Sequence, residues 1–257
     1  MNLWDAVILG IVEGITEFLP VSSTGHLLLA NRLLGHEPTD FLKSFDITIQ
    51  LGAILAVVVL YGRSLLVDRK VLMRVAAAFI PTAVAGLIFY KLIKNVLMDS
   101  APVVLWSLFL GGIFLIVFEK FHKEPPGAEG DIRKIPYGTA ALIGLFQALA
   151  MVPGVSRSAA TIIGGLLLGV RRKTIVEFSF LLAVPTMLAA TALDLLKNAS
   201  AFSADQAAFL ATGFAASFAV AIFSIKFLLY YIQRNNFILF GVYRIFAALV
   251  FWWIIRP

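Results

Sequence analysis

Long apolar runs alternate with short charged loops along this chain. A helix that crosses the hydrocarbon core of a membrane needs roughly 20 apolar residues. Six segments meet this requirement, namely residues 44–61, 72–90, 101–118, 177–196, 207–231 and 237–255. The pattern therefore predicts an all-α polytopic membrane protein that forms a single membrane domain with six transmembrane helices.

Two further apolar segments are each interrupted midway. The run "LPVSSTG" divides residues 3–34, and "VPGVSRS" divides residues 137–169. Proline removes a helix donor and clashes with the preceding turn, so each half-segment is too short to cross the membrane. Irregular backbone at membrane depth must be buried in protein or line a cavity. Each segment is therefore predicted to form a re-entrant helical hairpin.

The two hairpins resemble each other when the sequence is shifted by 134 residues. The shift superimposes Gly10 on Gly144, Val21 on Val155, Ser22 on Ser156, and Leu33, Leu34 and Gly35 on Leu167, Leu168 and Gly169. Three predicted spans follow each hairpin, which gives repeat 1 at about 3–118, repeat 2 at about 137–255 and a linker at 119–136. Because three is odd, the second copy enters the membrane upside down. Inverted repeats place their binding sites near the midplane, where broken segments meet.

The composition narrows the class of protein further. Only 14% of the residues are charged and the mean hydropathy is +0.94, which leaves no room for a sizeable soluble domain. The absence of cysteine excludes disulfides and thiolate chemistry. The net charge of +6 suits contact with anionic lipid. Nucleic acid is not an expected partner, because the basic residues are scattered over short loops.

The loop charges predict an orientation, because cytoplasmic loops carry an excess of Lys and Arg. One predicted face collects twelve of them: Arg63, Arg69, Lys70, Arg74, Lys120, Lys123, Arg133, Lys134, Arg171, Arg172, Lys173 and Arg234. The other collects six: Arg32, Lys43, Lys91, Lys94, Lys197 and Arg256. The first face is therefore expected to be cytoplasmic. Both termini and the entrance of the first hairpin are then extracytoplasmic.

Two glutamates stand out in the first hairpin. Glu13 and Glu17 are four residues apart, so on a helix they share a face. Two carboxylates at membrane depth are unfavourable unless one is protonated or a cation lies between them. Oxygen ligands of this kind suit Mg²⁺ or Ca²⁺. A solvated outer face or a helix-end position is the alternative, and Asp46 and Gln50 in the next span are further candidates for the cavity lining.

Hydroxyl groups follow the proline of the first hairpin. One of Ser22, Ser23 and Thr24 is expected to cap the returning helix. The same free N–H groups can bind an anion, and a hydroxyl beside a carboxylate can act as a nucleophile. His26 comes three residues after Ser23, so it can lie on the same face.

The second hairpin contributes a permanent cation, Arg157, at its break. A charge in the membrane needs a partner, and the planar guanidinium suits phosphate oxygens. An ion pair with Glu13 or Glu17 is the alternative. The neighbouring hydroxyl residues Ser156, Ser158 and Thr161 are expected either to extend an anion pocket or to act as caps.

Two other basic residues fall inside predicted spans. Lys226 and Arg244 are expected to snorkel to the membrane surface or to pair with an acid.

The two hairpins together offer acids, a hydroxyl, a histidine and an arginine. Phosphoryl transfer requires a positioned nucleophile, cationic stabilisation of charge and a proton acceptor. The pattern GxxxxGK[ST] of nucleotide hydrolases is absent from the chain. A site inside a lipid-facing bundle therefore points to a lipid phosphate.

The segments "EGITEFLPVSSTGH" and "PGVSRSAAT" closely resemble the two signature segments of the undecaprenyl-diphosphate phosphatase family, also called the bacitracin-resistance protein family. The resemblance extends over nearly the whole chain, with Ala159 a minor variation where glycine is common. It implies an enzyme of the bacterial inner membrane that removes the terminal phosphate of a C55 isoprenoid diphosphate and so recycles the carrier for cell-wall building blocks. It also implies an extracytoplasmic active site and dependence on a divalent cation.

This resemblance matches the acidic motif to Glu13 and Glu17, and the essential arginine to Arg157. In the expected mechanism Ser23 attacks the terminal phosphorus, and Glu17 or His26 accepts its proton. Direct attack by water, with Glu17 as the base, is the rival. A flippase of the polyprenyl phosphate is the alternative function, because inverted repeats are common in transporters. The sequence leaves a homodimer open.

Overall fold

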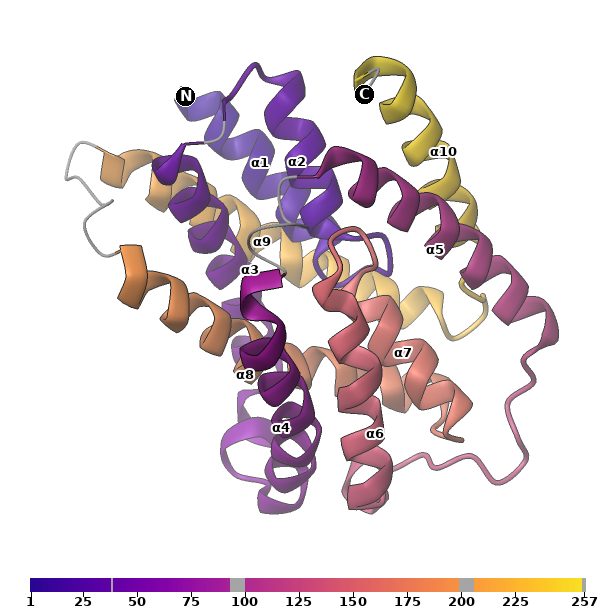
Figure 1. Ribbon diagram of the computed structural model, residues 1–257. Coiled ribbons are helices and arrows are strands. Elements are labelled where there is room, and N and C mark those ends of the chain that lie inside the picture. The colour runs from indigo at the N-terminus through magenta and orange to yellow at the C-terminus, as the bar shows by residue number, and fades with distance from the viewer. Residues whose placement is uncertain (38, 93–99, 199–205, 256–257) are drawn as a thin grey trace.

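The computed structural model describes residues 1–37, 39–92, 100–198 and 206–255, and within them the chain is helical (Figure 1). The α-helices are α1 (Leu3–Thr16), α2 (Ser23–Leu33), α3 (Asp40–Leu66), α4 (Arg69–Leu92), α5 (Ala101–Phe121), α6 (Tyr137–Ala148), α7 (Arg157–Leu167), α8 (Arg172–Asn198), α9 (Ala207–Tyr231) and α10 (Ile238–Ile255). Two short 3-10 helices, η2 (Ile132–Lys134) and η3 (Leu149–Met151), complete them.

Five helices in the described ranges are long and apolar enough to cross a membrane. They are α3, α4, α5, α8 and α9, and each coincides with a predicted span. The sixth predicted span, residues 237–255, is the shorter apolar helix α10. The prediction of an all-helical polytopic membrane protein is therefore confirmed at this level.

Both interrupted segments are broken where the sequence predicts. The first break, residues 17–22, separates α1 from α2, and the second break, residues 152–156, separates η3 from α7. Ser22 and Ser156 each begin an 11-residue helix, with positive φ angles of 74° and 79°. Non-glycine residues rarely adopt such angles, and they do so where the surroundings impose them. The local backbone thus repeats at the same spacing of 134 residues.

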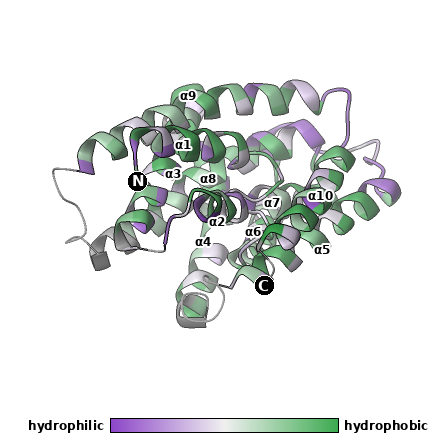
Figure 2. Cartoon of the chain, turned by 90° about the horizontal axis from the view of Figure 1, so that it is seen from above, coloured by the Kyte–Doolittle hydropathy of each residue, from purple (hydrophilic) through white to green (hydrophobic). Residues whose placement is uncertain are grey.

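The hairpins approach the centre of the molecule from opposite ends. In Figure 1 α1 and α2 lie at the end that holds both termini, whereas α6 and α7 extend toward the other end. Seen from above in Figure 2, α2 and α7 lie in the middle with longer helices around them. The two breaks therefore meet inside the bundle.

Each hairpin is held by a helix from the other half of the chain. Helix α1 packs mainly on α9, and α6 packs mainly on α4. The contacts are close because glycines lie at both crossings. A Cβ atom on Gly10 would lie 2.5 Å from the carbonyl oxygen of Gly213, and one on Gly144 would collide with the carbonyl of Ala78. A side chain at either position would push the hairpin away from its partner helix.

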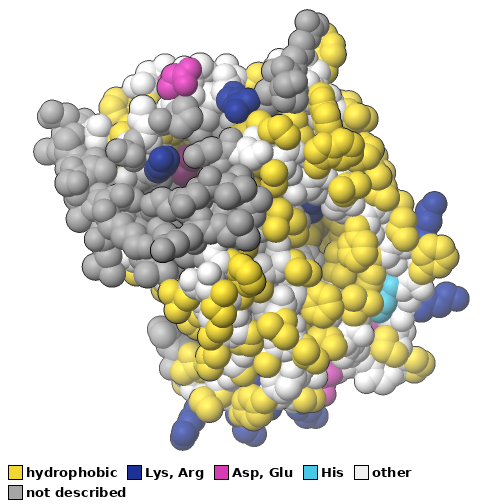
Figure 3. All heavy atoms as spheres, viewed as in Figure 1, with side chains coloured by type: hydrophobic (Ala, Val, Ile, Leu, Met, Phe, Trp, Pro, Cys, Tyr) yellow, Lys and Arg dark blue, Asp and Glu magenta, His cyan; other side chains and the backbone are white. Residues whose placement is uncertain are grey.

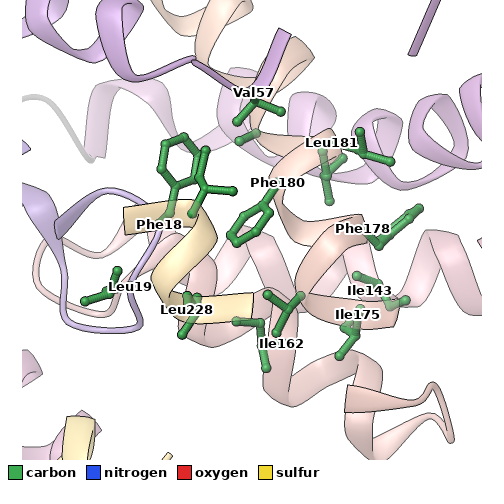
Figure 4. Close-up of a cluster of buried hydrophobic side chains, with 14 of the residues drawn as sticks. Phe18, Leu19, Val57, Ile143, Ile162, Ile175, Phe178, Phe180, Leu181 and Leu228 are labelled. Atoms are coloured by element: carbon green, nitrogen blue, oxygen red, sulfur yellow. The ribbon is translucent and has the colours of Figure 1, made fainter. Parts of the chain in front are cut away.

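The largest apolar cluster surrounds the breaks (Figure 4). Phe18 and Leu19 in the first break belong to this cluster, and the ring of Phe18 meets that of Phe180 on α8 edge-on at 5.4 Å. This packing anchors the first break to helices of the second half of the chain.

Charged contacts gather where four loops meet, around residues 67–68, 122–136, 168–171 and 232–237. Arg133 donates to Asp68 over 2.6 Å, and Arg172 pairs with Glu119. The hydrogen bond from Arg133 lowers the pKa of Asp68. On the face that Figure 3 shows, apolar side chains are numerous across the described surface, and the charged side chains lie mainly near the edges of the view. This distribution is typical of a protein whose middle faces lipid.

Candidate active site

The carboxylate of Glu17 joins the two hairpins. Arg157 donates from Nη2 to Oε1 of Glu17 over 2.8 Å, and Ser23 donates its hydroxyl hydrogen to Oε2 over 2.6 Å. Glu17 is the residue that caps the end of α1, and Ser23 and Arg157 are the first residues of α2 and α7. Glu17 and Ser23 are buried, at 5% and 8% exposed, and the side chain of Arg157 is 12% exposed. An acid, a hydroxyl and a guanidinium from two hairpins therefore form one buried hydrogen-bonded group.

Arg157 retains a free donor in this group. Its Nη1 donates to the carbonyl of Ser179 on α8 over 2.8 Å, and its guanidinium lies 5.8 Å from the ring centre of Phe18. Its Nε is buried and has no hydrogen-bond partner. A buried donor without a partner is costly, so this N–H is a ready site for a phosphate oxygen.

The returning helices present their N-termini at the breaks. The side chain of Ser22 accepts from the N–H of Gly25, and that of Ser156 accepts from the N–H of Ala159 over 3.2 Å. Both serines are therefore helix caps, one of the two roles expected for them. Ser158 instead donates to the carbonyl of Leu19 over 2.9 Å, which ties α7 to the first break.

His26 is buried on α2, and in the described part of the chain no hydrogen bond links it to the Glu17 carboxylate. Its Nδ1 lies 2.7 Å from the carbonyl of Ser22, and its Nε2 lies 2.8 Å from the hydroxyl of Tyr243. A carbonyl only accepts, so Nδ1 carries a hydrogen, and in the neutral ring Nε2 accepts from Tyr243. Both ring nitrogens are thus engaged. Of the two expected proton acceptors for Ser23, the geometry favours Glu17.

Glu13 differs from Glu17 in the hydrogen bonding of its carboxylate. It is 0% exposed, one helical turn before Glu17, and neither of its carboxylate oxygens has a hydrogen-bond partner. The nearby charges are those of Glu17, Asp46 and Arg157. Unpartnered carboxylate oxygens at this depth fit a hard cation. The described residues contain no group of three or more His, Asp or Glu side chains placed to hold a metal, so other ligands would have to come from substrate or water.

Comparison with known proteins identifies the family. The family model described as bacitracin resistance protein BacA matches residues 6–250. The chain is 51% identical over 251 residues to a protein of Aquifex aeolicus named undecaprenyl-diphosphatase, with 98% of each chain covered. Proteins with the same name from Sulfurihydrogenibium sp. and Thermus thermophilus are 50% and 46% identical, and at least 97% of each chain is covered. The chain belongs to the BacA family.

Some candidate residues of this BacA-family chain lie away from the buried group. Thr24 is exposed, and Thr161 is buried between α6 and α7, where it donates to the carbonyl of Arg157 over 2.9 Å. Gln50 is half-buried on α3, and within the described ranges no hydrogen bond links it to Glu17, Ser23 or Arg157. Asp46 lies beside Asn31 and is close enough to influence Glu13.

An apolar groove runs past His26. It has a volume of about 320 Å³ and lies between α1, α2 and α10, with Ile8, Val12, Ala30 and Phe251 among its lining residues. A smaller cavity of about 200 Å³ shares Leu33 and Phe251 with it and reaches Arg32. The groove therefore lies between the two helices of the first hairpin and α10.

Three residues that the sequence analysis did not assign to the site contribute to its surroundings. Tyr243 contacts His26, and Ser179 accepts from Arg157. Arg244 neither snorkels nor pairs with an acid in the described part of the chain, so that expectation was wrong. It is completely buried and donates to backbone carbonyls. Tyr243 and Arg244 stand in an apolar run with no motif, and the polarity of this pair was the only available signal.

Proposed function

We propose that this chain is an integral membrane phosphatase that hydrolyses undecaprenyl diphosphate to undecaprenyl phosphate and inorganic phosphate. One observation carries the proposal: Ser23 and Arg157 each donate a hydrogen bond to the carboxylate of Glu17. This arrangement brings together a nucleophile, a proton acceptor and a cation, the groups that phosphoryl transfer requires. The names of the relatives are consistent with this reaction. Hydrolysis of the carrier diphosphate serves cell-wall synthesis and confers resistance to bacitracin.

The first chemical step uses Ser23 as the nucleophile. Its Oγ forms a bond to the terminal phosphorus, and the bond from that phosphorus to the bridging oxygen breaks. Undecaprenyl phosphate departs with the bonding electrons, and the hydroxyl proton passes to Glu17, which already accepts that hydrogen over 2.6 Å. In the second step the oxygen of a water molecule bonds to the phosphorus of the phosphoserine and the Oγ–phosphorus bond breaks. Glu17 returns its proton to Ser23 Oγ, and both hydrogens of the water leave with inorganic phosphate as dihydrogen phosphate.

Arg157 and the helix ends bind the phosphate. The unpartnered Nε of Arg157 donates to a non-bridging oxygen, while the bonds to Glu17 and Ser179 fix the guanidinium. The N-termini of α2 and α7 add positive potential at the same place. Binding and turnover therefore require both hairpins.

Glu13 is the principal proposed ligand for a divalent cation, either Mg²⁺ or Ca²⁺, because its two oxygens are free whereas both oxygens of Glu17 are engaged. Such an ion supplies charge neutralisation for the diphosphate. Glu17 is the second candidate ligand.

The topology of the chain in the membrane is inferred from its helices and from the charges of its loops. We propose six transmembrane helices, with α10 as the sixth, and two re-entrant hairpins related as an inverted repeat. The positive-inside rule puts the basic loops in the cytoplasm, so α1 and α2 open to the extracytoplasmic side of the inner membrane. The isoprenoid tail occupies the apolar groove beside His26, which brings its phosphates toward Ser23.

Release of inorganic phosphate by the purified protein in detergent tests the function. Detergent has no sidedness, so turnover there requires an enzyme and not a flippase. The expected result is phosphate release from undecaprenyl diphosphate that is abolished by Ser23→Ala. Lipid movement in sealed vesicles without phosphate release in detergent would contradict the proposal.

A further inference from the structure

Arg244 lies where α10 passes the two breaks. Its side chain is completely buried, and its guanidinium donates to five backbone carbonyl oxygens. Nη1 reaches Pro20 and Val155 at 3.3 and 3.0 Å, Nη2 reaches Gly154 and Ser107 at 2.9 and 3.0 Å, and Nε reaches Leu108 at 3.4 Å. One side chain therefore connects the first break, the second break and α5.

These five bonds account for every N–H of the guanidinium. No hydrogen remains for a substrate phosphate, in contrast to Arg157, whose Nε is free. Within the described residues no carboxylate pairs with Arg244, so carbonyl dipoles alone stabilise its charge. A buried, unpaired arginine is costly in a membrane protein, and such residues commonly serve function.

The backbone of α5 makes room for this guanidinium. A Cβ atom on Gly111 would collide with Nη2 of Arg244, and one on Gly112 would lie 2.6 Å from the carbonyl oxygen of Gly241. Close approach of α5 and α10 thus depends on glycine, and Gly111 in particular leaves the volume that Arg244 occupies.

We propose that Arg244 is a positioning residue, which holds the two breaks in register so that Ser23 and Arg157 face one phosphate. Ser23 follows Pro20 by three residues, and Arg157 follows Val155 by two, so movement of either carbonyl is passed directly to the reacting groups. This inference rests on the proposed function for its catalytic consequence. Its structural part, the register of the breaks, is independent of any substrate.

The first test compares turnover in Arg244→Ala, Arg244→Lys and Gly111→Ala. Misplacement of catalytic groups by about 1 Å lowers rates by roughly 100-fold. We expect kcat to fall by about that factor in all three variants while KM changes less than about threefold. We expect no recovery of kcat in Arg244→Lys relative to Arg244→Ala, because one ammonium cannot donate to five carbonyls. The matched control is Lys226→Met, which removes an exposed basic residue from α9 and leaves turnover unchanged.

A double-mutant cycle separates positioning from general damage. If Gly111→Ala acts by displacing the guanidinium, it has no further effect in the Arg244→Ala background. Additive losses, or wild-type kcat in folded Arg244→Lys and Gly111→Ala, would overturn the proposal. Folding is checked by the size-exclusion profile and Tm of each purified variant.

Spin-label distances give a readout that needs no substrate. The chain lacks cysteine, so Leu33→Cys and Leu167→Cys, both at exposed positions at the ends of α2 and α7, can be labelled specifically. We expect a narrow distance distribution that broadens or shifts with Arg244→Ala and with Gly111→Ala but not with Lys226→Met. An unchanged distribution in both variants refutes the role of Arg244. A changed distribution together with an active Ser23→Ala protein would instead refute the proposed chemistry and retain the positioning role.

Discussion

Ser23 and Glu17 lie on opposite sides of a helix break, and the hydroxyl of Ser23 donates to Glu17 Oε2 over 2.6 Å. Ser23→Ala removes the proposed nucleophile without removing the charged groups. We expect kcat to fall by at least about 1,000-fold with substrate binding retained. Rapid quenching of the wild type with labelled substrate should trap phosphoserine at residue 23. Thr212→Ala, which removes an exposed hydroxyl from α9, is the matched control. Substantial activity in Ser23→Ala would favour direct attack by water.

Arg157→Lys keeps the positive charge but loses the planar guanidinium. The ammonium of a lysine cannot at the same time donate to Glu17, donate to the carbonyl of Ser179 and donate a third hydrogen bond in the direction of the unpartnered Nε. We expect kcat/KM to fall by about 100-fold or more, in a phosphate-release assay with folded protein. Near-normal activity would show that charge alone suffices and that Arg157 does not hold the phosphate by directed hydrogen bonds.

Glu13→Gln distinguishes a cation ligand from a structural acid. The amide has nearly the same shape but lacks the charge that a divalent ion requires. We expect the Mg²⁺ or Ca²⁺ concentration for half-maximal activity to rise by at least about tenfold, with activity partly restored at high metal. Asp5→Asn is the control, since it changes another acid of α1 that is paired with His36 at the far end of the helix. An unchanged metal requirement would remove Glu13 from the cation site.

Tyr243→Phe removes the hydroxyl that fills the acceptor position of His26. The ring stacking between these residues, with centroids 5.5 Å apart, should persist. If His26 only orients α2, we expect kcat to fall less than about tenfold, because Glu17 remains the proton acceptor. The pH profile of kcat measures this directly. A loss as large as that of Glu17→Gln would assign the proton transfer to His26.

The close crossing of α6 and α4 predicts that a larger residue at this contact lowers the stability of the protein. Gly144→Ala would place a Cβ atom against the carbonyl of Ala78, and overpacking of this kind typically costs about 1–3 kcal/mol. We expect a lower Tm in detergent. Gly138→Ala on the same helix meets no neighbouring atom and should leave Tm unchanged or slightly raised, because alanine favours helix. Equal Tm values for both variants would contradict this account of the crossing.

The sequence predicted most of the helices because their apolar length is a local property. Even the two breaks could be located, since Pro20 and Pro153 interrupt otherwise apolar segments. The sequence offered Glu13 and Glu17 as alternative ion-pair partners of Arg157, but it could not choose between them. That Arg157 chooses Glu17 and leaves Glu13 unpaired depends on how α1, α7 and α8 pack, which no periodicity encodes.

Arg244 shows even more clearly that the sequence pattern does not reveal which groups a buried side chain contacts. Membrane arginines usually snorkel or pair with acids, and the expectation for Arg244 followed that rule alone. Its real acceptors are carbonyls from three distant segments, and a carbonyl carries no side-chain signature. Gly111, whose missing side chain leaves room for the guanidinium, lies on α5 and is far from Arg244 in the sequence.

The packing of α1 on α9 and of α6 on α4 has a consequence for biogenesis. When α1 and α2 emerge from the ribosome, the helix that will brace them has not been synthesised. The first hairpin, with its unpaired acid and broken backbone, must therefore wait in the membrane or at its surface until nearly the whole chain has been inserted. Completion of the active site is thus one of the last events in the assembly of the protein.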